Sequence, residues 1–241
     1  MKDTNDKGYP KKKAGDAAHA LVKGTISSVP YVGGLASEIF SLVIAPSIEK
    51  RRDDWFRSIG ERLSELEEKA EGFNIENLKG NESFVTTFTN ATILALRTHQ
   101  EEKLETLRNA IINAALPGPP EDDIQILFLH FVDAFTTHHI KILDLLNDPY
   151  EWANRHNLRL PNSSIGNIEM VVSLAFPDFK AQKGFYEMLI NDLYSRGLIR
   201  INSSAGLYTT QSFSGVLSPH TTPLGVKFLT FIANPFINKN S

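Results

Sequence analysis

The chain has 241 residues, of which 41% are hydrophobic and 22% are charged, so a buried core is expected and general disorder is not. A net charge of −3 argues against a protein built around the neutralisation of nucleic-acid phosphates. The absence of cysteine excludes disulfides, thiolate metal sites and cysteine nucleophiles. It also suits the cytoplasm, where we expect the protein to reside.

The N-terminal region contains a polar tail followed by an apolar stretch. Residues 1–17 combine Lys, Asp, Gly and Pro without periodicity, which predicts a disordered tail. Residues 24–46 are the most apolar part of the chain, but Glu38 and the prolines interrupt them, whereas a membrane span needs about 20 apolar residues. We therefore expect a buried hairpin, and a membrane-acting effector that inserts this hairpin is the further alternative.

Residues 18–156 are predicted to form a helical bundle domain. After Pro46, apolar residues recur every three or four positions and predict an amphipathic helix whose inner face carries Trp55, Ile59, Leu63, Leu66 and Ala70. A second, long helix is predicted over 82–116, and the Pro-Gly-Pro-Pro segment at 117–120 ends it. Two more helices are predicted, one after the acidic residues 121–123 and one capped by Thr136 or Thr137.

Residues 157–241 are predicted to form a second, smaller domain. A helix over 179–195, with Phe185, Met188, Leu189 and Leu193 on its inner face, is followed by a hairpin of residues 198–201 and 207–210 and by a last helix after Thr221 or Thr222. This order is similar to that of the winged-helix family. The predicted fold is therefore mainly α, with an N-terminal helical bundle plus a small C-terminal winged-helix-like α+β domain.

The winged-helix resemblance raises the question of DNA binding, because the helix before the wing usually enters the major groove. The candidate nucleic-acid contacts are Lys180, Lys183, Arg196, Arg200 and Lys227. Against DNA binding, Glu187 and Asp192 lie on the same helix, and residues 203–206 at the predicted wing tip carry no charge. We therefore favour a domain that docks a protein partner or a second copy of the chain, and a DNA-binding regulator is the alternative.

Signals for catalysis or metal binding are weak. His130, Asp133, His138 and His139 lie within ten residues, but the adjacent histidines diverge by about 100° around a helix and do not form the i, i+4 pair of a helical zinc site. The charged cluster at 49–55 is predicted to be a solvated helix face with Trp55 in the core. We expect no catalytic residue, cofactor or metal, and hence a protein that is not an enzyme.

Two segments resemble the abortive-infection proteins of the Abi-alpha type, a loosely defined group of uncharacterised bacterial proteins. The first is FLHFVDAFTTHHIKILDLLNDP, residues 128–149. The second is the C-terminal part of the chain, which contains LYSRGLI from residue 193 and TPLGVKFLTFI from residue 222. The resemblance covers about the last half of the chain. It implies a bacterial protein that acts in phage defence or stress response through partner contacts, and it implies no catalytic residues.

Overall fold

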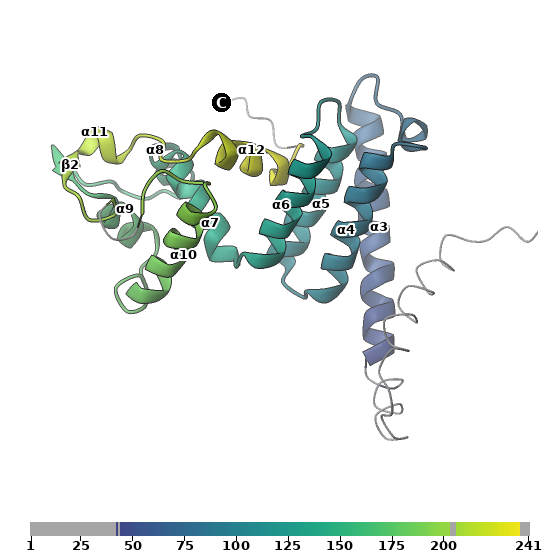
Figure 1. Cartoon of the computed structure of the whole chain (residues 1–241), viewed down its shortest axis with the longest axis horizontal. Helices are drawn as coiled ribbons and strands as arrows, with labels where there is room; N and C mark the ends of the chain where they lie inside the picture. Colours follow the sequence, from purple (N-terminus) through teal and green to yellow (C-terminus); the bar gives the residue numbers. More distant parts are fainter. Residues whose placement is uncertain (1–41, 43, 203–205, 237–241) are drawn as a thin grey trace, which may run out of the picture. The chain divides into compact units, whose positions relative to one another are not determined.

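The computed structural model describes residues 42, 44–202 and 206–236 (Figure 1). The predicted tail at 1–17, most of the apolar stretch 24–46 and most of the predicted wing tip lie outside these residues. The described residues are mainly helical with a small two-stranded sheet, which confirms the predicted class. In chain order the elements are α3 (Ala45–Lys69), η2 (Ile75–Leu78), α4 (Glu82–Arg97), α5 (Glu101–Ala115), α6 (Asp122–Ala134), α7 (Thr137–Asn147), α8 (Pro149–Arg155), β1 (Ile165–Gly166), α9 (Ile168–Ala175), α10 (Lys183–Ser195), β2 (Gln211–Ser212), α11 (Phe213–Val216) and α12 (Pro223–Ile232).

Residues 52–241 cluster as one compact unit, and α3 supplies its first helix. The predicted inner face of this helix is confirmed, because Trp55, Ile59 and Leu66 are buried. The Trp55 indole N–H donates to the hydroxyl of Thr92 on α4 at 3.1 Å, so the polar edge of the ring is satisfied. On the solvent side, Arg57 and Asp54 form an ion pair, as expected of a solvated helix face.

The predicted single helix over 82–116 is wrong, because the chain turns between Arg97 and Glu101. Thr98 and Gln100 adopt extended conformations, and α4 and α5 pack against each other as neighbouring helices. No proline or glycine marks this turn, so local propensity alone does not predict it. The turn forms because the apolar stripes of the two halves bury each other, with Ala91, Ala95 and Leu107 almost fully removed from solvent.

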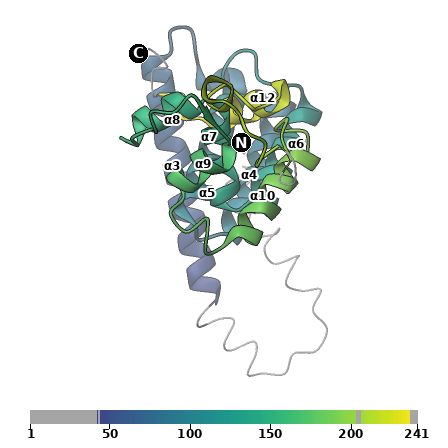
Figure 2. The same cartoon turned by 90° about the vertical axis from the view of Figure 1, so that its left-hand side faces the viewer.

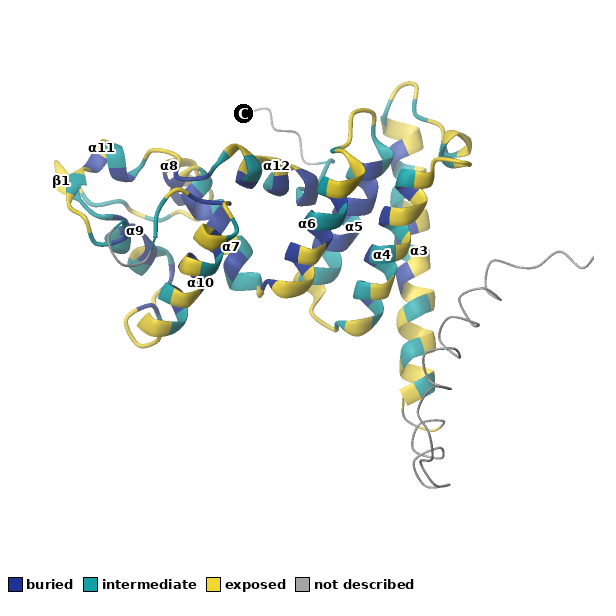
Figure 3. Ribbon diagram, in the orientation of Figure 1, coloured by how far each residue is buried: buried dark blue, intermediate teal, exposed yellow. Residues whose placement is uncertain are grey.

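Phenylalanine side chains of α6 and α12 are buried and pack against one another. Figure 3 shows that both helices carry buried residues. The ring of Phe128 lies 5.4 Å from that of Phe228 and 5.7 Å from that of Phe231, and Phe131 meets Phe228 edge-on. The predicted cap of α12 is confirmed, since the Thr222 hydroxyl accepts a hydrogen bond from the Gly225 N–H at 3.1 Å. The predicted domain boundary between residues 156 and 157 stays a prediction, as does the one after residue 17.

The strands pair differently from the predicted hairpin of 198–201 with 207–210. Residues 198–200 instead lie against 220–222, where the Thr222 N–H donates to Leu198 O and the Arg200 N–H donates to His220 O, both at 2.9 Å. β1 pairs in antiparallel fashion with β2, with Ile165 opposite Ser212. Tertiary packing explains this pairing. Helix α12 packs on α5 and α7, and residues 220–222, which directly precede α12, are thereby held beside Leu198.

The inner face of α10 also differs from the prediction at one residue. Leu189 and Leu193 are buried as expected, and Gly197 ends the segment with a φ of 72°. Met188, however, is 56% exposed, and Tyr186 takes its place in the core. Helix α10 begins at Lys183 instead of Phe179, because residues 178–182 form turns before it.

Candidate functional site

The five cations predicted to contact nucleic acid lie in different surroundings. Lys180 lines a cavity of about 650 Å³ beside β1 and α9, whereas Lys227 lines one of about 710 Å³ between α12 and the loop that precedes α6. Arg200 is exposed. Lys183 and Arg196 are each engaged by acidic and aromatic side chains. Contact of these residues with nucleic acid stays a prediction.

Lys183 belongs to a small cluster that ties α10 to the segment before β2. Its ammonium lies 4.6 Å from the centre of the Tyr208 ring and 3.8 Å from a carboxylate oxygen of Glu187. The Tyr208 hydroxyl donates to Glu187 at 2.6 Å. Burial raises the pKa of Tyr208, and the hydrogen bond to the Glu187 carboxylate adds to this rise, so the phenol remains protonated and a donor. The charge of Lys183 is therefore largely balanced within the protein.

Arg196 is held at the junction of α10 with α6 and α7. Its Nε donates to Asp192 Oδ1 at 2.9 Å, and its guanidinium lies 5.3 Å from the ring centre of Phe135. The other carboxylate oxygen, Asp192 Oδ2, is 3.4 Å from Nε2 of His139 on α7. This row of side chains fixes the C-terminal half of α10 on the aromatic core.

His139 is buried in this junction and serves as an internal cap of α7. Its Nδ1 accepts a hydrogen bond from the Thr136 backbone N–H at 3.0 Å, and its ring stacks on Phe135 with centres 4.7 Å apart. The proton of the neutral ring is therefore on Nε2, which is buried without a well-formed hydrogen bond. Burial lowers the pKa of His139, Asp192 opposes this shift, and the nearby Arg196 charge adds to it, so that the pKa is about 4.

The solvent side of α10 presents a different surface. Figure 2 views the molecule from the side on which α8, α9 and α10 lie. Met188 is 56% exposed and Tyr194 is 45% exposed. They share the outer side of the helix with Gly184, Asn191 and Ser195, and we call these five residues the α10 surface. The sequence did not predict the α10 surface, because the apolar spacing of the helix placed Met188 in the core.

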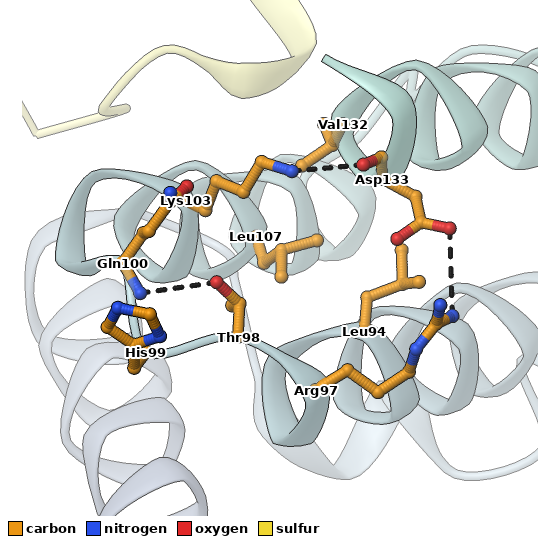
Figure 4. A pocket seen from close by; sticks show the side chains of 9 residues that line it. All are labelled: Leu94, Arg97, Thr98, His99, Gln100, Lys103, Leu107, Val132 and Asp133. Carbon is orange, nitrogen blue, oxygen red and sulfur yellow. Dashed lines mark hydrogen bonds and ion pairs between the residues drawn. The ribbon is translucent and has the colours of Figure 1, made fainter. Parts of the chain in front are cut away.

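A polar pocket of about 270 Å³ lies at the turn between α4 and α5 (Figure 4). Leu94, Leu107 and Val132 form its apolar wall, and Lys103 extends across it. The Lys103 ammonium donates to the backbone oxygen of Asp133 at 2.9 Å, while the Asp133 carboxylate faces Arg97 at 3.6 Å. Burial lowers the pKa of Lys103, the Asp133 carboxylate opposes this shift, and the Arg97 charge adds to it.

The sequence does not predict this pocket. The single helix predicted over 82–116 separates Arg97 from Lys103 by more than a turn and does not bring Asp133 to them. The turn at residues 98–100 brings Arg97 and Lys103 to one end of the α4–α5 pair, and α6 contributes Asp133. His99 and Gln100, from the turn itself, complete the rim.

The adjacent histidines His138 and His139, which were considered as metal ligands, pack against aromatic residues. His138 packs its ring near those of Phe176 and Tyr186, whereas His139 caps α7, so the two adjacent histidines face different neighbours. Among the described residues, no three His, Asp or Glu side chains are grouped closely enough to hold a metal ion. No helix within the described ranges has the length and apolar character needed to cross a membrane.

No protein-family model, curated protein or solved structure matches the chain.

Proposed function

We propose that the protein acts by association and not by catalysis, and that it pairs with a second copy of itself through the α10 surface. One observation carries the proposal: the helix that would read DNA exposes Met188 and Tyr194, whereas its cations Lys183 and Arg196 are occupied by acids of the same helix. Exposed methionine and tyrosine are enriched in protein interfaces, because they bury a large area at a small cost in conformational entropy.

The charge balance of α10 favours a second copy as the partner. Lys183 with Glu187 and Arg196 with Asp192 are i, i+4 pairs, so each cation has its counter-charge on the same helix. A surface without net charge can face its own copy across a two-fold axis without repulsion. Gly184 lies on this surface, and a Cβ there would meet no atom within 4 Å, so another backbone can approach closely.

The arrangement of the C-terminal segment supports a winged-helix-like assignment as part of this proposal. The order is strand β1, helices α9 and α10, then strand β2, and β1 pairs with β2. In a winged helix, a strand before two helices pairs with a strand after them, and the second of the two helices is exposed to the binding partner. In such an arrangement α10 is the second helix, and here it offers apolar groups to a partner. From the resemblance to abortive-infection proteins we propose that this association serves bacterial phage defence or stress response.

The proposal is tested by sedimentation equilibrium of the whole chain at micromolar concentrations. We expect a dimer, and we expect Met188→Glu to raise its dissociation constant by about tenfold or more, as for the loss of an interface anchor. The matched control is Ile93→Glu, which places the same charge at an exposed apolar residue of α4. The control should leave the dimer intact.

Two results would contradict the proposal. The first is a monomer at all concentrations, and the second is equal weakening by both substitutions. Fluorescence anisotropy with a random-sequence duplex, repeated across a salt series, tests the alternative. Binding that falls steeply with salt, together with a monomeric chain, would establish phosphate contacts and favour the DNA-binding regulator.

A further inference from the structure

We infer that the pocket between α4, α5 and α6 binds a small monocarboxylate with a short apolar body. The site combines an apolar wall with two cations, Arg97 and Lys103, that share one carboxylate, Asp133. Leu94 is partly exposed and supplies the accessible apolar wall, whereas Leu107 and Val132 lie behind it and are almost fully buried. The volume of about 270 Å³ lies just below the range of about 300–1,000 Å³ for typical ligand sites, so the ligand is small.

The charges around the pocket determine the ligand class. The carboxylate of Asp133 faces the guanidinium of Arg97 and also acts on the charge of Lys103, so one negative charge is shared by two cations. The Lys103 ammonium is bonded to a backbone carbonyl, which accepts a hydrogen bond but supplies no negative charge. One positive charge therefore remains in a partly buried position. A ligand with a single negative charge neutralises it. The second negative charge of a dianion would have no cation to pair with and would be repelled by the Asp133 carboxylate.

The arrangement of side chains shows how such a ligand would lie. In Figure 4, Lys103 passes above Leu107 and reaches the end of α6 at Asp133, whereas Leu94 lies nearer to Asp133 and Arg97. An apolar body fits against Leu94 while the carboxylate reaches the Lys103 ammonium, which has two more N–H groups to donate beside the one bonded to Asp133. His99 and Gln100 line the open side and can contact the carboxylate from the turn.

The inference is tested by isothermal titration of the full chain with benzoate, benzamide and acetate at fixed ionic strength. Benzamide keeps the ring and lacks the charge, whereas acetate keeps the charge and lacks the ring. We expect benzoate to bind at least about tenfold more tightly than either, as expected for one charge-assisted hydrogen bond and one buried ring. Equal affinity for benzoate and benzamide, or no binding of benzoate, would overturn the inference.

Two lysine variants locate the site. Lys103→Met should weaken benzoate by about tenfold or more, because it removes the charge and keeps a side chain of similar length. Lys141→Met is the matched control, because that ammonium bonds Glu102 at 2.9 Å on an exposed surface and its loss should leave benzoate binding unchanged. Equal losses in both variants would place benzoate elsewhere. Tighter binding of inorganic phosphate than of benzoate would overturn the carboxylate assignment.

Discussion

His139 should make the folded state sensitive to mild acid. The perturbation is a decrease in pH from 7 to 5 in the wild-type chain. The ring is buried and neutral, and its Nδ1 accepts the Thr136 N–H, so a second proton would have to displace that hydrogen bond. Burial lowers the pKa of His139 from its ordinary value of 6.5 to about 4. The unfolded chain, in which the ring is solvated, therefore takes up the proton at a higher pH than the folded chain does.

The magnitude follows from the two pKa values. With a pKa of 6.5 in the unfolded chain and about 4 in the folded one, the contribution of His139 is fully present above pH 6.5 and is lost as the pH falls towards 4. Between pH 7 and pH 5 this loss is about 2 kcal/mol, a large part of the stability of an ordinary domain. Burial also lowers the pKa of His220, which adds a loss of the same sign.

Urea unfolding at pH 7, 6 and 5, followed by circular dichroism, measures this effect in the wild-type chain and in His139→Gln. Glutamine at this position can still accept the Thr136 N–H, as in a capping box, but it does not titrate. The variant should lose about 2 kcal/mol less than the wild type between pH 7 and pH 5. The same pH dependence in both proteins would refute the assignment of this effect to His139.

Two further predictions concern how α12 is held. Gly225→Ala should destabilise the fold by at least about 1 kcal/mol, because a Cβ there would overlap the carbonyl oxygen of Leu198, whereas Gly60→Ala, in open space on α3, should stabilise it by about 0.5–1 kcal/mol. Thermal unfolding of both variants checks the pair, and equal shifts would contradict the close approach. Asn113→Ala should cost about 1–2 kcal/mol, because the Asn113 amide donates at 2.8 Å to the carbonyls of both Phe231 and Ala233 at the end of α12. Exposed Asn154→Ala is its control, and equal stability of the two variants would show that the amide does not hold the helix end.

Signals that act over a few residues predicted much of the secondary structure. The three-to-four residue spacing around Trp55 and Ile59 predicted α3 and its buried face, because a helix must bury one continuous stripe. Thr136 and Thr222 predicted the starts of α7 and α12, because capping depends on side chains next to the helix end. The same spacing, repeated along the chain, also predicted the mainly helical class.

Features that depend on contacts between distant segments were decided by the tertiary structure alone. The turn between α4 and α5 has no local breaker and forms because the two apolar stripes pack on each other, and this packing creates the pocket around Lys103. The partner of residues 198–200 is set by α12, which packs on α5. The exposure of Met188 follows from which side of α10 meets α7, and the periodicity of α10 alone does not determine that side. In each case a local pattern allows several arrangements, and the burial of apolar surface between distant elements selects one.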